Sequence, residues 1–195
     1  MKSISSLLIT ALSAALVAGS ALAAGPATAA TVLLGACSTQ KLESYANEKP
    51  LLDLQQYFNG TLDAYGVFTD RSGRVVKRFT VVMNCSWNGE QGVLDEDFVY
   101  SDGSTQKRIW KLQHLGNGNY SGAADDVVGL ANGATRGNTF RWGYTLALPV
   151  DGRVWEVQFD DWMYLMSDRV MLNKASMSKF GVFLGEVTLS FTKRA

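Results

Sequence analysis

Histidine, cysteine and proline are scarce in this chain, which contains one, two and three of them among 195 residues. The single histidine, His114, excludes a multi-histidine metal site within one chain. The sequence also has no G-x-S-x-G nucleophile elbow, P-loop, dinucleotide-binding glycine fingerprint, C-x-x-C pair or calcium loop. We therefore predict no metal and no cofactor, and we identify no catalytic residue.

Neither sign of charge is in excess, since 18 basic side chains match 18 acidic ones. Lys2 is the only charged residue before Cys37, so removal of residues 1–36 would leave 159 residues with 17 basic and 18 acidic groups. Without a basic excess, a nucleic-acid partner is excluded. The 47% hydrophobic content argues against disorder, and a chain of this size can form one domain with a core.

The N-terminus has the pattern of an export signal. Lys2 precedes an apolar run from Ile4 to Ala24 that is rich in small residues. An uncleaved membrane helix is the alternative, but Gly25-Pro26 would break such a helix.

Two cleavage sites compete after this signal. Ala21-Leu22-Ala23 fits ordinary signal cleavage, whereas Leu34-Gly35-Ala36-Cys37 fits a bacterial lipobox, in which the cysteine thiol receives a diacylglycerol. We predict a lipoprotein signal peptide at 1–36 and lipidation of Cys37; cleavage after Ala23 would instead leave Cys37 free to pair with Cys85. Ser38 is not the Asp associated with inner-membrane retention, so we predict the Gram-negative cell envelope, at the outer membrane and facing the periplasm.

The rest of the chain reads as a tether and one β domain. Residues 37–49 are polar and predict a tether, 50–195 predict a single β-barrel domain, and Pro50–Phe58 predicts a short N-terminal helix. Dense turn signals separate alternating apolar runs and predict eight to nine strands, at residues 61–69, 74–87, 92–100, 105–115, 119–130, 138–148, 153–166, 169–179 and 182–193. An antiparallel up-and-down meander of this kind removes its edges by closing, so we predict an all-β, lipocalin-like barrel.

Period-two alternation places large apolar side chains on the inner face of the barrel. The candidate apolar lining consists of Met83, Trp87, Trp110, Trp142, Tyr144, Phe159 and Met163. Small barrels either fill with such side chains or enclose one small ligand, and the pattern leaves both alternatives open.

Charged residues also fall on inward positions. The candidate polar positions are Glu96, Arg108, Asp126, Asp161 and Lys174. A three-residue hairpin loop pairs Glu96 with Arg108, and a two-residue loop at Ser167-Asp168 pairs Asp161 with Lys174. These groups are either structural pairs that set the register or polar groups that orient a ligand headgroup.

Alternation fails at one place, where Trp162, Tyr164 and Met166 lie on the face expected to be exposed to water. The expected helix at 50–58 would cover this ridge. The alternative is a docking surface for the membrane or a partner.

From about Leu52 to Lys193 the chain resembles an uncharacterised family of proteobacterial lipoproteins, a domain-of-unknown-function family. The matching segments are Tyr57–Gly60, Leu94–Phe98, Ala124–Gly129, Pro149–Arg153, Phe159–Met166, Lys179–Gly181 and Gly185–Val187. The resemblance implies a lipobox and an envelope location, and it supplies no catalytic residues. Genes of that family often lie beside those of fatty-acid-modifying enzymes, so the resemblance favours a lipid ligand. The plan of anchor, tether and meander is also similar to bacterial lipocalins, although the lipocalin G-x-W is not clear here.

Together these features predict a lipid-anchored envelope barrel that binds an apolar small molecule such as a fatty acid or lipid. The alternative is a non-catalytic scaffold or interaction protein with a filled barrel. A third hypothesis is an enzyme that uses an interior carboxylate. The sequence predicts the membrane as a partner through the lipid anchor, and it names no protein partner.

Overall fold

The computed structural model describes residues 40–150 and 152–195. The predicted signal peptide at 1–36 and the lipidation site at Cys37 lie outside these residues. Within the described ranges, no helix is both long enough and apolar enough to cross a bilayer.

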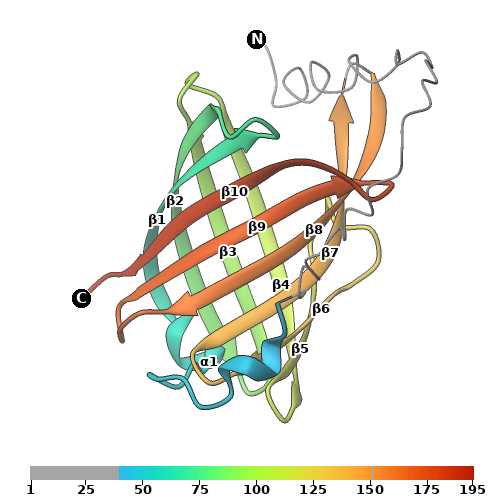
Figure 1. The fold of residues 1–195 in the computed structure, drawn as a ribbon. Coiled ribbons are helices and arrows are strands. Elements are labelled where there is room, and N and C mark those ends of the chain that lie inside the picture. The colour runs from blue at the N-terminus through green and yellow to red at the C-terminus, as the bar shows by residue number, and fades with distance from the viewer. Residues whose placement is uncertain (1–39, 151) are drawn as a thin grey trace, which may run out of the picture.

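Ten antiparallel strands form a closed barrel, in which each strand pairs with its neighbours in sequence and β1 pairs with β10 (Figure 1). The strands are β1 (Gly60–Asp70), β2 (Val75–Asn88), β3 (Gln91–Tyr100), β4 (Thr105–Gly116), β5 (Asn119–Ala123), β6 (Ala131–Arg136), β7 (Thr139–Val150), β8 (Arg153–Leu165), β9 (Val170–Lys179) and β10 (Val182–Lys193). The all-β class and the closed meander are as the turn spacing predicts, but there are ten strands rather than eight to nine.

The additional strand lies at 131–136, where the sequence predicts a turn between strands at 119–130 and 138–148. The structure instead has β5, a loop and then β6, and the turn signal Asn132-Gly133 lies inside β6. A Cβ on Gly133 would lie 2.3 Å from the Cβ of Trp142, so the missing side chain allows Trp142 of β7 to pack over this strand. A strand built from small residues has no apolar alternation, and the pattern analysis therefore missed it.

Alternation along the other strands builds the core. On β2, Phe79, Val81 and Met83 point inward and are 5%, 4% and 1% exposed, while the intervening residues are exposed. The inner faces assigned from sequence on β2, β7 and β8 have this phase.

A single α-helical turn, α1 (Leu54–Tyr57), closes one end of the barrel, and it is the short helix expected at 50–58. Asp53 caps it, because its Oδ1 accepts hydrogen bonds from the backbone N–H groups of Gln55 and Gln56. Leu54 and Tyr57 are buried in the core. We call the end closed by α1 the sealed end. The opposite end, where β1 connects to β2, is called the mouth.

The β3–β4 hairpin has the register that the sequence predicts. Leu94 faces Trp110 and Glu96 faces Arg108. Gly103 occupies the left-handed position of the turn with φ of 80°. The loop chemistry therefore sets the pairing here.

The β8–β9 hairpin differs from its expected register by one residue. Its loop holds the four residues 166–169 rather than two, so Asp161 faces Ala175 and not Lys174. Because a one-residue shift turns every side chain to the other face, Lys174 lies outside, with its Nζ 3.0 Å from Glu186. The predicted interior pair of Asp161 and Lys174 is wrong.

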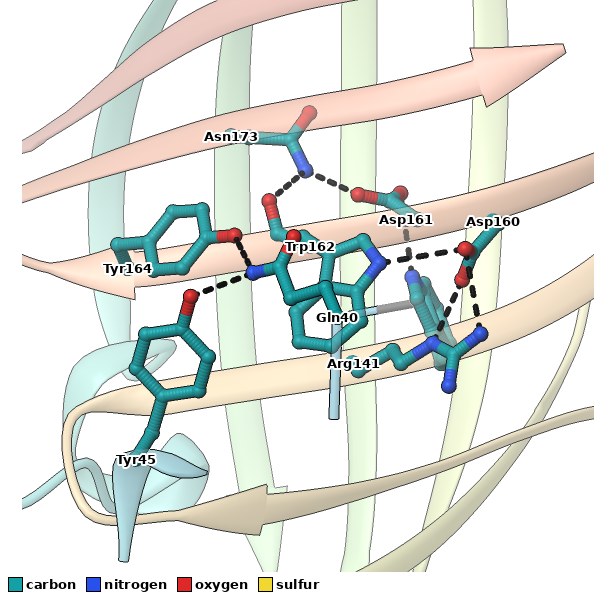
Figure 2. A network of polar contacts seen from close by, with 9 residues as sticks. Gln40, Tyr45, Arg141, Asp160, Asp161, Trp162, Tyr164 and Asn173 are labelled. Carbon is teal, nitrogen blue, oxygen red and sulfur yellow. Dashed lines mark hydrogen bonds and ion pairs between the residues drawn. The ribbon is translucent and has the colours of Figure 1, made fainter. Parts of the chain in front are cut away.

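The residues 40–49, which belong to the predicted tether, lie against the outside of the barrel and are called the 40–49 segment below. Its 3-10 turn, η3 (Leu42–Tyr45), places the Tyr45 ring 6.1 Å from that of Trp162 and 5.7 Å from that of Tyr164 (Figure 2). Gln40 Nε2 donates to the Tyr164 hydroxyl at 2.6 Å. The 40–49 segment, and not the helical turn, thus covers Trp162 and Tyr164 of this ridge, and Trp162 is only 7% exposed. The third residue, Met166, stays 55% exposed.

Candidate ligand-binding cavity

The barrel encloses a cavity of about 460 Å³ that reaches the mouth at Thr69, Lys77 and Pro149. Most of its lining is apolar or aromatic. This volume lies within the range of about 300–1,000 Å³ that is usual for small-molecule sites. The barrel is therefore hollow over the part of its interior nearer the mouth.

Six of the seven apolar residues predicted to line a cavity do line it: Met83, Trp110, Trp142, Tyr144, Phe159 and Met163. The seventh, Trp87, lies at the sealed end, where its indole Nε1 donates to the Phe58 carbonyl at 2.8 Å. Its ring packs over Gly92, where a Cβ would come within 2.7 Å of it. Trp87 is thus part of the end closure and not of the cavity wall.

Four aromatic rings form a cluster on one side of the cavity. Trp110 lies 4.5 Å from Trp142 and 5.3 Å from Tyr144, centroid to centroid. Phe159 stacks on Tyr144 at 5.0 Å. Strands β4, β7 and β8 hold these rings rigidly, because each ring side chain projects from a paired strand position.

Asp161 lies beside this cluster with both carboxylate oxygens hydrogen-bonded. Trp142 Nε1 and the Tyr144 hydroxyl donate to Oδ2 at 3.2 and 3.3 Å. Asn173 Nδ2 donates to Oδ1 and also to the Trp162 carbonyl (Figure 2). Burial raises the pKa of Asp161 to about 6, although the three donors act in the opposite direction.

Arg108 is paired with Asp126 rather than with Glu96, its cross-strand neighbour. Its Nη2 lies 2.6 Å from Asp126 Oδ2, and its Nε also donates to that carboxylate. Asp126 comes from the loop between β5 and β6, so the loop that the sequence analysis read as strand supplies this contact. The guanidinium charge is thereby balanced within the cavity wall.

Glu96 is the charged group of the cavity that lacks a partner. It is 8% exposed and lines the cavity, and no residue in the described part of the chain makes a hydrogen bond or ion pair with its carboxyl group. Burial raises the pKa of Glu96 to about 7, because Arg108 offsets only part of the desolvation.

Asn173 and Lys77 are polar residues of the cavity lining that were not among the sites predicted from the sequence. Asn173 was assigned to the outer face by the register error. Lys77 lies at the mouth, with its Nζ 2.9 Å from Asp102 and 4.5 Å above the Tyr100 ring. Its position two residues before Phe79 is the period-two signal that could have identified it.

Among residues 40–150 and 152–195, no three His, Cys, Asp or Glu side chains are grouped to hold a metal ion. Cys85 is buried and makes no disulfide with a described residue. The chemistry that the cavity offers is therefore apolar enclosure with a few fixed polar groups.

The family model "Protein of unknown function (DUF3833)" matches residues 31–193. The chain belongs to the DUF3833 family. The match includes Cys37, α1 and all ten strands, and so the whole cavity lies within the DUF3833 region. No curated protein sequence matches the chain significantly.

Solved structures with similar folds include the S-type phycobiliprotein lyase CPES from Guillardia theta, with a TM-score of 0.56 and 5% sequence identity over 80% of this chain and 99% of that one. A DUF3598-family protein of unknown function from Nostoc punctiforme has a TM-score of 0.52 and 10% identity, over 75% of this chain and 51% of that one. At these identities the similarity concerns the fold of the DUF3833 barrel alone.

Proposed function

We propose that this DUF3833 protein is a lipid-anchored envelope protein whose barrel binds an apolar, lipid-like small molecule, a class that includes fatty acids. The cavity of about 460 Å³ with its mainly apolar and aromatic lining carries the proposal. A filled barrel, the scaffold alternative, would leave no such space. The fold neighbours are consistent with a small-molecule site, and one of them is named a phycobiliprotein lyase.

Native mass spectrometry of the protein purified from its own membranes tests the binding. We expect an apolar molecule that co-purifies and that is lost when the cavity is filled by Ala175→Phe, since Ala175 is buried in the cavity wall. Lys174→Phe, one residue away on the outer face, is the matched control and should keep the molecule. Protein that carries no apolar molecule and binds no fluorescent apolar probe would favour the scaffold alternative.

The anchor is part of the same proposal and rests on the lipobox at Leu34–Cys37. Cys37→Ala should remove the acyl mass from the mature protein and release it from the membrane fraction. Intact-mass analysis together with fractionation measures both. A mature N-terminus at Ala24, or an unmodified Cys37 in the membrane-bound protein, would refute the anchor.

A further inference from the structure

The cavity wall carries more acidic than basic side chains. Its charged lining residues are the two basic side chains Lys77 and Arg108 and the four acidic side chains Asp70, Glu96, Asp126 and Asp161. Each basic group already contacts a carboxylate: Lys77 contacts Asp102, and Arg108 contacts Asp126. A ligand carboxylate would therefore find no free cation here and would add a further negative charge.

Glu96 is the cavity carboxyl that has no direct hydrogen bond or ion pair with a described residue, although Arg108 faces it across the strand pair and offsets part of the rise that burial causes in its pKa. Its carboxyl is more than nine-tenths buried and faces the cavity without a hydrogen-bond donor from the described part of the chain. A buried ionised carboxylate costs several kcal/mol unless it is paired. The chain satisfies Asp161 with three donors and leaves Glu96 with none.

Aromatic side chains lie on the same inner face of the barrel as Glu96. Trp110 is the diagonal neighbour of Glu96 across the β3–β4 pair, two positions from Arg108 on the same face. Trp110 also belongs to the ring cluster with Trp142, Tyr144 and Phe159. Aromatic faces attract cations through their quadrupoles, and cages of such rings bind organic ammonium groups.

From this juxtaposition we propose that the polar end of the bound molecule is an organic ammonium group held between Glu96 and the aromatic cluster, so that the ligand is an amphiphilic amine rather than a free fatty acid. This inference rests on the proposed binding of an apolar molecule in the cavity. An ammonium group would supply the charge that Glu96 lacks, and the apolar wall would enclose the chain. It narrows the lipid class without changing the proposed function.

The test compares three probes with the same chain and different heads: decyltrimethylammonium, decan-1-ol and decanoate. Each is titrated calorimetrically into the full-length protein in a non-ionic detergent near neutral pH, with protein-free micelles as the blank. We expect the ammonium probe to bind at least tenfold more tightly than the alcohol and the carboxylate probe to bind most weakly. Equal affinities, or a preference for decanoate, would overturn the ammonium inference and leave the proposed function standing. Failure of all three probes to bind folded protein would refute the proposed function itself.

Two variants of β3 locate the recognition. Glu96→Gln should remove most of the ammonium preference and leave the affinity for decan-1-ol within twofold. Asp97→Asn removes the same charge from the outer face of the strand, where Asp97 contacts Lys107, and should change neither affinity. An ammonium preference that survives Glu96→Gln unchanged would show that Glu96 is not the partner.

A second readout follows from proton balance. The quaternary probe carries no proton, so binding beside a partly protonated Glu96 should release a proton from the protein. The binding enthalpy near neutral pH should then vary with the ionisation enthalpy of the buffer, and this dependence should disappear in Glu96→Gln. A buffer-independent enthalpy in the wild-type protein would contradict direct contact between the ammonium group and this carboxyl.

Discussion

Glu96 and Asp161 share one cavity but differ in how the chain treats them. Asp161 receives hydrogen bonds from Asn173, Trp142 and Tyr144, so it is held in one orientation. Glu96 has no such donor among the residues that the structure describes. The Asp161 carboxylate is therefore fixed in the cavity wall by hydrogen bonds. The Glu96 carboxyl group makes no hydrogen bond with a described residue and is available to the ligand that we propose.

This difference predicts how stability depends on pH. The pKa of Glu96 is raised by burial from 4.5 to about 7, so the folded state binds its proton more tightly than the unfolded state does. The resulting stabilisation is complete below pH 4.5 and is lost as the pH rises through about 7. Glu96→Gln lacks this loss, and its stability relative to wild type should rise by on the order of 3 kcal/mol across that window.

Urea unfolding of both proteins at a series of pH values measures this effect. Asp161, with a pKa raised to about 6, contributes a loss of the same sign in both proteins. Its repulsion with Glu96 acts only in the wild-type protein and so adds to the difference without changing its sign. Asp97→Asn should run parallel to wild type. A difference between Glu96→Gln and wild type that stays constant with pH would show that Glu96 is not desolvated in solution.

The neighbours Asn173 and Lys174 lie on opposite faces of β9, so their substitution by alanine should lower stability by different amounts. Asn173→Ala removes the donor to Asp161 Oδ1 inside the barrel and should cost about 2–3 kcal/mol. Lys174→Ala removes an ion pair whose lysine side chain is 64% exposed, and it should cost less than about 1 kcal/mol. Chemical denaturation of the two variants decides between the observed register and the one expected from sequence, in which Lys174 would be the costly position.

At the scale of elements, the sequence predicts a hairpin well where the turn chemistry is unambiguous. Gly103 at a left-handed position favours one register, and Glu96 and Arg108 face each other across the strands as expected, although Arg108 forms its ion pair with Asp126. Ser167-Asp168 carries no such constraint. The loop has four residues, and Ser167 Oγ accepts hydrogen bonds from the backbone N–H groups of Arg169 and Val170. As a result, the inward and outward faces of β9 are exchanged relative to the expected register.

Tertiary packing explains the other departures from the sequence-based expectation. Nine predicted cavity residues lie on strands and follow from period-two alternation: Met83, Glu96, Arg108, Trp110, Trp142, Tyr144, Phe159, Asp161 and Met163. Asp126 also lines the cavity, but from a loop, so alternation does not account for it. Asn173 could not be found, because its face depends on a loop length. The cavity could not be predicted either. Its size depends on how far α1 extends into one end of the barrel, and the side-chain volumes read from the sequence do not show this.

Tyr45 of the 40–49 segment should contribute to stability and shield Trp162 from solvent. Tyr45→Ala removes ring contacts with Trp162 and Tyr164, which should lower stability by about 1–2 kcal/mol. It should also expose Trp162 to iodide quenching, with Trp162→Phe versions used to assign the fluorescence. Gly137→Ala should act alike, because φ is 55° and a Cβ there would lie 1.8 Å from the Tyr45 carbonyl oxygen. Unchanged quenching in both variants would mean that the segment does not cover Trp162 in solution.

At the scale of the whole molecule, the barrel has two different ends. Residues 52–58 close one end, and the cavity reaches the other. The ligand that we propose would therefore reach the cavity through the mouth. The position of the proposed anchor would decide which surface of the barrel faces the lipid.

The proposed anchor predicts that orientation. Two residues, Ser38 and Thr39, separate Cys37 from Gln40, which is hydrogen-bonded to Tyr164 near the sealed end of β8. The three Cα–Cα steps from Cys37 to Gln40 can span at most about 11 Å, so an acylated Cys37 would keep this part of the barrel wall close to the bilayer. β3 is five strands from β8 in the ring in either direction, and Val99 on β3 is 51% exposed near the mouth.

Fluorophores attached at Met166→Cys and Val99→Cys test this orientation in membrane-bound protein with a quencher in the lipid headgroups. The proposed acylation would block Cys37, and burial protects Cys85, which is 6% exposed, so each label would report one site. Met166 is 55% exposed beside the 40–49 segment, and its label should be quenched, whereas the label at Val99 should not. Stronger quenching at Val99 would show that the barrel is not held at the membrane through Gln40. The stretch from Cys37 to Gln40 is too short to bring the β3 side of the barrel to the bilayer while the 40–49 segment stays on β8.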